Sequence, residues 1–404
     1  MKLTAFFSKY APMLFLSALY VVLTIIYYFW RGQYNAMADD QADFHRIALN
    51  VLSGKGFDEK GFRCFLQPAY LATIYALFGV SSKAVFAVNT LLGIVSLWLV
   101  NELGHRIFVS RQVGYLSAFL LCCNLPSIAA NTTLFSEVTF VFTLLVAVWA
   151  IMRHYFSPQN WQYLVLSAFS LGLATLCREW IQYILVFAIP LTAWQYKSQW
   201  HSYTVRMVLF LLIWSATLLP WIWRNYQLYD RFLVGTTRTG LLLYSAANPI
   251  NGNIYGINVT DSLTQYADTH FSNPVEGSDF LVQKTKEQLL ANPKRIPYLL
   301  ALKTLYFFLF IDYELTQQRT INLSYLLWFP FFLYGLWQLF RQRNHIQHWL
   351  LVALLIGIFF LNYAICLITY GSPRFRYSTE IYAIMVAAFG VYYAYRRYFI
   401  GARE

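Results

Sequence analysis

Long apolar runs alternate with short charged segments along most of this 404-residue chain. A helix of about 20 residues crosses the hydrocarbon core of a bilayer. At that length the apolar runs predict about ten membrane-spanning helices. They lie near residues 11–30, 84–104, 112–128, 134–152, 161–177, 180–196, 206–223, 321–340, 349–369 and 378–396. We therefore expect an all-α integral membrane protein whose helices form a polytopic bundle.

Basic residues in the short connections predict which side of the membrane each loop faces, because cytoplasmic loops carry an excess of Lys and Arg. One set of loops and tails contains Lys2, Lys9, Arg106, Arg111, Arg153, Lys197, Arg206, Arg341, Arg343, Arg396, Arg397 and Arg403. We expect these loops, and with them both termini, to be cytoplasmic. Two long polar segments then face the other side: outer loop 1 (about 31–83) and outer loop 2 (about 224–320).

The two outer loops contain segments that read as helices lying along the membrane surface, near residues 40–52, 68–79 and 297–310. The last of them is apolar apart from Lys303, so an eleventh span near 297–313 is the alternative. The alternation of basic loops after it favours the surface position. Because the chain ends soon after its last span, we expect no separate C-terminal soluble domain, and residues 1–404 form one predicted membrane domain.

The composition supports a membrane protein and argues against a soluble enzyme. Hydrophobic residues make up 58% of the chain and charged residues 12%, whereas soluble domains average about 45–50% and about 25%. Most of the net charge of +12 falls in the predicted cytoplasmic loops. The excess is therefore a topology signal, and we expect no nucleic-acid partner.

The densest acidic cluster in the chain is Asp39, Asp40 and Asp43, at the start of the amphipathic segment 40–52. Asp side chains at a helix start commonly cap free N–H groups and interact with the positive end of the helix dipole. A carboxylate at the membrane face could equally act as a general base on a hydroxyl or amine. Composition alone leaves both interpretations open.

Motifs that are weak singly occur in an ordered series along the chain. The series is Asp40, Phe44, Ala48, Leu52 and Gly54-Lys55-Gly56-Phe57, then Pro68-Ala69-Tyr70, Asn89 with Gly93, Leu134-Phe135-Ser136-Glu137, Gly172 to Arg178, Leu219 to Tyr226, Asn292-Pro293 with Lys303, and Arg374-Phe375-Arg376-Tyr377. In this order, over roughly residues 10–395, the chain resembles the bacterial GT-C glycosyltransferases. That superfamily includes the protein O-mannosyltransferases and the lipid A aminoarabinose transferase, which use polyprenyl-phosphate sugars.

The resemblance implies a GT-C-like fold and transfer of a hexose or pentose from a polyprenyl-phosphate donor to a lipid, glycan or protein acceptor. It places the protein in the bacterial inner membrane with its active site on the periplasmic face. The family's catalytic base matches Asp40, with Asp39 and Asp43 as neighbours. Where the family more often has Tyr, this chain has Phe44, which lacks the hydroxyl.

Four arginines at predicted outer ends of spans are candidates for holding the donor phosphate: Arg178, Arg224, Arg374 and Arg376. Arginine binds phosphate through bidentate, charge-assisted hydrogen bonds. The alternative is that each is an interfacial anchor that reaches the headgroups. Glu137, at the outer start of a span, suits a structural and a site role equally. Tyr70 follows the position where relatives often have Arg-Pro-Pro, and here Arg63 is displaced from that position.

The sequence indicates no required cofactor. A divalent cation held by Asp40, Asp43 and His45 is left open, and the sequence identifies no metal site beyond that. A lipid-linked-sugar flippase or transporter is one alternative function, but such proteins usually carry ionisable or helix-breaking residues near mid-membrane. A polysaccharide polymerase or ligase is the other, and the early Asp-containing helix favours the GT-C interpretation over it.

Overall fold

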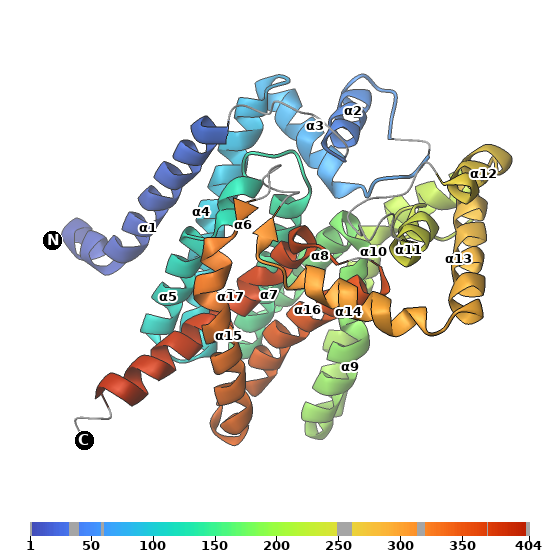
Figure 1. Cartoon of the computed structure of the whole chain (residues 1–404). Helices are drawn as coiled ribbons and strands as arrows, with labels where there is room; N and C mark the ends of the chain where they lie inside the picture. Colours follow the sequence, from blue (N-terminus) through green and yellow to red (C-terminus); the bar gives the residue numbers. More distant parts are fainter. Residues whose placement is uncertain are drawn as a thin grey trace.

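The structure is a computed structural model that describes residues 2–31, 40–57, 60–248, 261–312, 320–369 and 371–400. Helices dominate these residues (Figure 1). The strands that interrupt them are β1 (Ile311–Asp312) and β2 (Thr320–Ile321), which pair antiparallel with Ile311 opposite Ile321. The predicted helical membrane fold is confirmed.

Six described helices are long and apolar enough to cross a membrane. They are α1 (Lys2–Arg31), α4 (Ser82–Ile107), α7 (Glu137–Phe156), α10 (Trp200–Tyr229), α15 (Leu323–Arg341) and α16 (Trp349–Ile368). Each coincides with one of the predicted spans. These helices make the protein a multi-pass membrane protein.

The other four predicted spans correspond to helices that are shorter or carry more charge. They are α5 (Arg111–Cys122) with α6 (Leu125–Ala130), α8 (Trp161–Cys177), η1 (Glu179–Tyr183) with α9 (Ile184–Gln195), and α17 (Pro373–Tyr395). The run at 112–128 is divided because Asn124 is extended and Pro126 opens a new helix. The number ten therefore stays a prediction.

The surface helices predicted in the outer loops are present as α2 (Asp40–Leu52), α3 (Leu66–Phe78) and α14 (Arg295–Phe307). Outer loop 2 also contains α11 (Thr239–Ala247), α12 (Ser262–His270) and α13 (Pro274–Ala291). Three short helical turns complete the described elements: η2 (Lys197–Gln199), η3 (Arg343–His345) and η4 (Arg396–Ile400). With 13 residues, α14 is shorter than the length of about 20 that a span needs, which favours its surface position.

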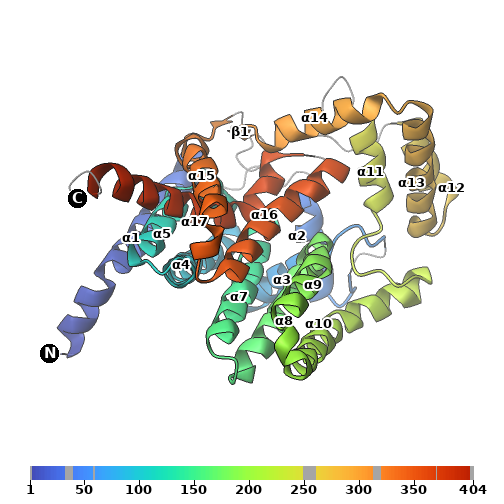
Figure 2. The same ribbon diagram turned by 90° about the horizontal axis from the view of Figure 1, so that it is seen from below.

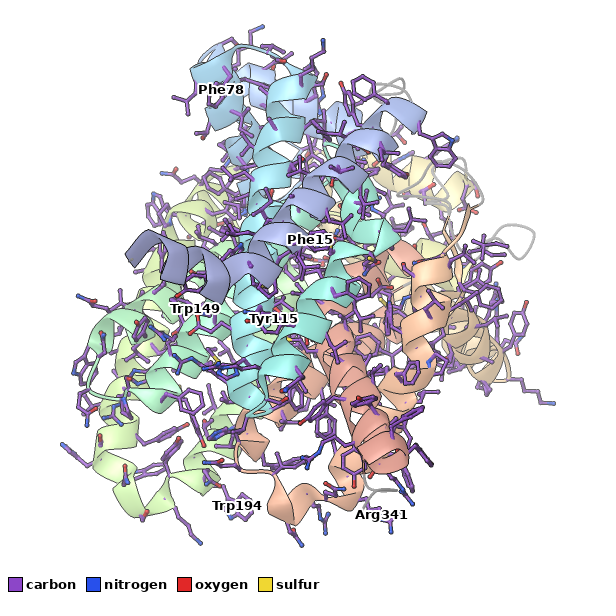
Figure 3. The ribbon with its side chains drawn as sticks, turned by 90° about the vertical axis from the view of Figure 1, so that its left-hand side faces the viewer. Phe15, Phe78, Tyr115, Trp149, Trp194 and Arg341 are labelled. Carbon is purple, nitrogen blue, oxygen red and sulfur yellow. The ribbon has the colours of Figure 1, made fainter. Side chains whose placement is uncertain are left out.

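The helices have two distinguishable ends. Helices α2 and α3 lie at the top of Figure 1, whereas α9 and α15 reach the bottom. Phe78, at the end of α3, and the pair Trp194 and Arg341 mark these opposite ends in Figure 3. Seen from below, α1 lies at one side of the molecule and α11 to α14 at the other (Figure 2). Helices α7 and α8 pack together and are joined by a short turn, so the first residue of α7 and the last of α8 lie at one end.

Helix α17 forms the centre of the bundle. Most of its residues from Pro373 to Gly390 are buried, and it packs against α15, α5 and α16. Its closest approach is to α15, where a Cβ atom on Gly390 would collide with the carbonyl oxygen of Phe331 and one on Gly335 with that of Val386. Small residues let two membrane helices approach this closely. The position of α17, and of the polar residues at its first turn, therefore depends on this glycine contact.

We predict that Gly390→Ala lowers the free energy of unfolding by about 1–3 kcal/mol, because the added methyl group would force α17 away from α15. Gly357→Ala is the matched control. A Cβ at that helical glycine would meet only Ile184, 3.9 Å away, so the same change should be neutral or stabilise by up to about 1 kcal/mol. Thermal unfolding of the purified protein in detergent measures both. Equal unfolding temperatures for the two variants would contradict the close packing.

Candidate active site

Helix α2 presents its polar first turn beside the bundle and buries its other face. Phe44, Ile47 and Ala48 are buried, and α2 packs on α3. Asp40 and Asp43 lie in its first turn, where they also suit the helix dipole. Asp39, the third predicted acid, lies outside the described residues.

Two arginines from distant parts of the chain hold Asp40. Its Oδ1 atom lies 2.6 Å from Nη2 of Arg63, and its Oδ2 atom lies 3.2 Å from Nη1 of Arg374. The side chain remains 27% exposed, so this carboxylate can still be reached by a substrate. Burial by itself would raise the pKa of Asp40, but the guanidinium groups of Arg374 and Arg63 outweigh it and hold the pKa below its usual value. Asp40 is therefore ionised at neutral pH.

Asp43 is held differently. Its Oδ2 atom accepts hydrogen bonds from Nη2 of Arg63 at 2.8 Å and from Nε at 3.1 Å, while its Oδ1 atom lies 3.3 Å from Arg46. Arg63 therefore lies between the two carboxylates of α2. Although Arg63 is displaced along the sequence from the motif position, the turn between α2 and α3 brings its side chain over the first turn of α2.

Below Asp40, a second acid connects two arginines inside the bundle. Glu137 is fully buried, and its Oε1 atom lies 2.5 Å from Nε of Arg374 and 2.7 Å from Nη2 of Arg178. Arg374 lies in the first turn of α17, two residues after the capping residue Ser372, and Arg178 follows the last turn of α8. Three helix ends thus meet at one carboxylate, and Arg374 joins it to Asp40.

Two buried polar atoms in this group make no hydrogen bond to a described residue. Nη1 of Arg178 and Oε2 of Glu137 are buried and have no hydrogen-bond partner among the described residues. Aromatic rings flank the arginines: Arg374 lies 3.8 Å from the centre of the Phe135 ring, and Arg178 lies 5.5 Å from that of Phe375. A buried donor without a partner is costly, and a bound anion would satisfy it.

Two glutamines fix the acidic helix to the bundle. Gln41 of α2 accepts a hydrogen bond from the N–H of Leu134 at 2.9 Å, and Gln67 of α3 donates one to the Leu134 carbonyl at 2.8 Å. Gln67 also accepts a bond of 2.6 Å from the Thr139 hydroxyl. The segment just before α7 is thereby attached to α2 and α3. This attachment sets the distance between Asp40 and Glu137.

Arg376 lies in a different set of contacts. Its Nε atom lies 2.6 Å from Glu380, and its Nη1 atom donates to the carbonyls of Phe307 and Leu309 at 2.6 and 2.8 Å. The ring of Tyr325 lies beneath the guanidinium, 3.8 Å away. These contacts attach the end of α14 to α17 and involve neither Asp40 nor Glu137.

Arg224 also makes contacts away from the acids of α2. It donates to Asn225 at 2.9 Å and lies 4.6 Å from the centre of the Trp221 ring, at the end of α10. Of the four arginines predicted from sequence, the structure therefore brings two, Arg178 and Arg374, to the same group of acids. The roles of all four in binding remain predictions.

The remaining predicted site residues have structural partners. Tyr70 donates a 2.6 Å hydrogen bond to Asn89, and burial raises the pKa of its phenol. His45 shares a 2.9 Å hydrogen bond with Tyr75, and burial lowers its pKa. Within the described ranges, no three His, Cys, Asp or Glu side chains come together as metal ligands. Asp40, Asp43 and His45 thus do not come together as a cation site.

Outer loop 2 brings one further arginine to the group, which no motif indicated. Arg238 lies 4.1 Å from the centre of the Phe62 ring. Burial lowers the pKa of its guanidinium, and Arg63, Asp43 and Asp40 lie close enough for their charges to influence this pKa. The loop is docked by Glu179, which accepts a 2.6 Å hydrogen bond from the N–H of Thr236. A lone arginine in an irregular segment carries no sequence signal, so this neighbour emerges only from the fold.

Part of the chain is similar to a known protein family. Residues 63–223 match the family model described as dolichyl-phosphate-mannose-protein mannosyltransferase. A comparison with curated protein sequences gives no significant match.

Solved structures extend the comparison to nearly the whole chain. The archaeal oligosaccharyltransferase AglB from Archaeoglobus fulgidus, in complex with an inhibitory peptide and a dolichol-phosphate, has a TM-score of 0.58 and 12% identity. The match covers 98% of this chain and 52% of that one. An oligosaccharyltransferase from the same organism, tethered by a disulfide bond to an acceptor peptide containing the NVT sequon, has a TM-score of 0.59, 14% identity and coverages of 99% and 51%. This chain therefore spans about half the length of the oligosaccharyltransferase.

ArnT from Cupriavidus metallidurans bound to undecaprenyl phosphate is a weaker match, with a TM-score of 0.46, 12% identity and coverages of 94% and 77%. The likeness to the oligosaccharyltransferase structures confirms the predicted GT-C-like fold. The family model over residues 63–223 supports the resemblance to GT-C membrane glycosyltransferases.

We predict that Glu137→Gln lowers the free energy of unfolding by about 3–5 kcal/mol, because Arg178 and Arg374 would lose their shared buried counter-ion. Glu102→Gln is the matched control. Glu102 also pairs with two arginines, Arg106 and Arg153, but it is 30% exposed, so we expect a loss of about 0.2–1 kcal/mol. Thermal or denaturant unfolding in detergent measures the difference. Equal losses in the free energy of unfolding would contradict the view that the burial of Glu137 makes its ion pairs more important for stability than those of Glu102.

Proposed function

We propose that this protein transfers a sugar from a polyprenyl-phosphate-linked donor to a lipid, glycan or protein acceptor at the periplasmic face of the bacterial inner membrane. One observation carries the proposal: Arg374 joins an accessible, ionised carboxylate, Asp40, to a buried group in which Arg178 has a donor without a partner. A general base and an anion-binding site thus lie side by side.

The donor class is supported by the comparisons. The similar archaeal oligosaccharyltransferase was solved with a dolichol-phosphate, and the matching family model is that of a dolichyl-phosphate-mannose-dependent transferase. A donor already attached to a lipid phosphate suits a site at the end of membrane helices. The orientation follows from the basic loops at the opposite end of the bundle.

The proposed reaction needs one base and one anion site. An oxygen or nitrogen atom of the acceptor attacks the anomeric carbon while the bond from that carbon to the phosphate oxygen breaks. The phosphate departs with the bonding electron pair as polyprenyl phosphate, and the acceptor's proton passes to Asp40. Phosphate is a good leaving group that needs no proton, so a single carboxylate suffices and its low pKa is tolerable.

Arg178 and Arg374 supply the charge that the departing phosphate requires. Nη1 of Arg178 is buried and has no hydrogen-bond partner among the described residues. Arg374 lies between Asp40 and Glu137. Glu137 holds both guanidinium groups in position, so they need not reorganise as charge develops. Electrostatic stabilisation of this kind is strongest where water is partly excluded. Arg224 and Arg376 are not assigned to the phosphate.

We predict that Asp40→Asn lowers the rate of sugar transfer by about 10²–10⁴-fold, because asparagine keeps the shape of the side chain but cannot accept the proton. Asp43→Asn is the comparison variant. It removes a carboxylate that holds Arg63 without touching Arg374 in the described structure, so we expect a smaller loss, below about tenfold. Assays of purified protein with a lipid-linked sugar give both rates. Near-normal activity of the folded Asp40→Asn variant would remove Asp40 from the role of base.

We predict that Arg63→Gln shifts the acidic limb of the kcat/KM profile to higher pH. Asp40 is active when ionised, so activity is lost as pH falls through its pKa. Removing Arg63 takes away one of the two charges that keep this pKa low, and the loss should then begin at a higher pH. Arg231→Gln, at an exposed arginine of outer loop 2 that pairs with Asp279, is the control and should leave the limb in place. An unchanged limb in Arg63→Gln would contradict the assignment.

A further inference from the structure

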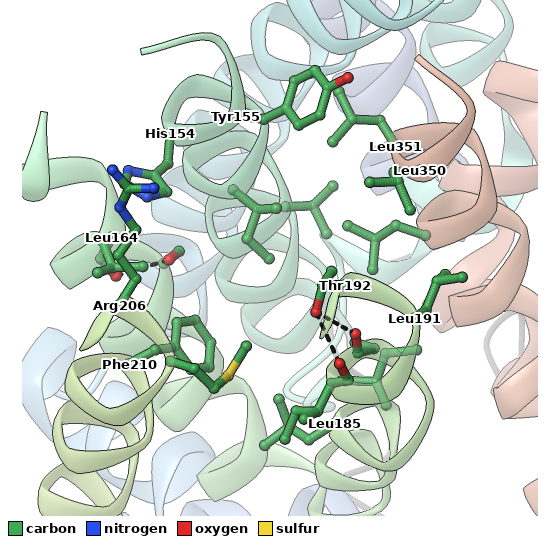
Figure 4. Close-up of a pocket in the computed structure, with 18 of the residues that line it drawn as sticks. His154, Tyr155, Leu164, Leu185, Leu191, Thr192, Arg206, Phe210, Leu350 and Leu351 are labelled. Carbon is green, nitrogen blue, oxygen red and sulfur yellow. Dashed lines mark hydrogen bonds between the residues drawn. The ribbon is translucent and has the colours of Figure 1, made fainter. Parts of the chain in front are cut away.

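A cavity lies in the bundle, with its polar rim away from the candidate active site. It has a volume of about 490 Å³ and lies between α7, α8, α9, α10 and α16 (Figure 4). Its wall is apolar and includes Leu144, Ile184, Leu185, Phe210, Leu351 and Ile358. Pockets that hold small ligands commonly measure about 300–1,000 Å³ and are lined in this way.

The polar rim of the cavity is separated from the acid–arginine group by most of the length of α7, although the apolar wall extends along that helix to Leu144. That helix begins at Glu137 and reaches the cavity's polar rim at His154. At a rise of about 1.5 Å per residue, the two positions are about 25 Å apart. A donor whose phosphate lies at Arg178 therefore cannot place the same phosphate at this rim.

One arginine at the rim, Arg206, has a buried hydrogen-bond donor without a partner among the described residues. Nε of Arg206 is buried and has no hydrogen-bond partner in the part of the chain that the structure describes, and no described acid pairs with this guanidinium. The guanidinium lies near the ring of Trp161, 5.8 Å from its centre. His154 lies beside Arg206 on the same side of the cavity, close enough for the charge of Arg206 to act on it (Figure 4). Positive charge and hydrogen-bond donors thus meet above an apolar hollow.

The surroundings of the cavity are those of a lipid site. Val186 and Phe187 on α9, beside the hollow, are exposed on the outside of the bundle. Tyr196, Gln199 and Tyr203 add polar atoms to the rim. In this helical membrane protein, exposed apolar side chains face acyl chains, and the basic residues at this end predict the cytoplasmic leaflet.

We propose that the cavity binds an anionic glycerophospholipid of the cytoplasmic leaflet. An acyl chain would occupy the apolar hollow, and the headgroup phosphate would accept hydrogen bonds from Arg206 and the polar rim. Arg206 favours a lipid with net negative charge, because the ammonium group of a zwitterionic headgroup would add a second positive charge beside the guanidinium. This site is independent of the transfer reaction proposed above.

The test is native mass spectrometry of the full-length protein in detergent, titrated with phosphatidylglycerol and with phosphatidylcholine of the same acyl chains. We expect phosphatidylglycerol to bind about tenfold more tightly, and Arg206→Gln to abolish that preference. Lys197→Gln is the matched control. It removes one positive charge from the same end of the bundle at a residue that does not line the cavity, and should leave the preference intact.

A second variant tests the hollow itself. Gly357 lines the cavity, and a Cβ there meets only Ile184 at 3.9 Å, so Gly357→Phe places a ring in open space and should reduce binding of both lipids. Asp40→Asn should bind lipid like the unmodified protein, which separates this proposal from the proposed transfer. Equal affinity for the two lipids, an unchanged preference in Arg206→Gln, unimpaired binding in Gly357→Phe, or displacement of phosphatidylglycerol by an equal concentration of polyprenyl phosphate would each overturn it.

Discussion

The guanidinium of Arg374 is shared by two carboxylates, and the outer end of the bundle is organised around that sharing. One of them, Asp40, belongs to a surface helix, and the other, Glu137, is buried at the first residue of α7. A charge at this depth is tolerated only when it is paired, because leaving one partner alone in a low-dielectric interior costs several kcal/mol, of order 3–5. Pairing these charges requires that four helix ends lie close together, those of α2, α7, α8 and α17.

This constraint connects the fold to the proposed chemistry. The glycine contact between α15 and α17 positions the first turn of α17, and with it Arg374. Gln41 and Gln67 hold α2 and α3 against the start of α7. What results is an accessible carboxylate next to a buried cationic group in which one guanidinium donor has no partner among the described residues. A site built on helix ends in this way needs little rearrangement to receive a lipid phosphate, because its charges are already in place.

Much of this could be predicted from the sequence where the signal is local. The amphipathic spacing after Asp40 predicts α2, and the apolar runs predict the six long helices. The residues at outer span ends include Glu137, Arg178 and Arg374, which the structure does bring together. Arg376 shows the limit of that reasoning. It shares a motif and a helix turn with Arg374, but it faces the carbonyls at the end of α14, a direction that only tertiary packing determines. Arg63 and Arg238 reach the group through turns of irregular structure, for which a single sequence has no periodic signal.

We propose that Arg178 and Arg374 hold the donor phosphate next to Asp40. An experimental structure of the full-length protein with bound undecaprenyl phosphate would show whether they do. We expect phosphate oxygens within about 3.2 Å of Nη1 of Arg178 and of the Arg374 guanidinium, on the side where Asp40 is exposed. A phosphate bound elsewhere, for example at Arg224, with Arg178 and Arg374 contacting only Glu137 and Asp40, would contradict it.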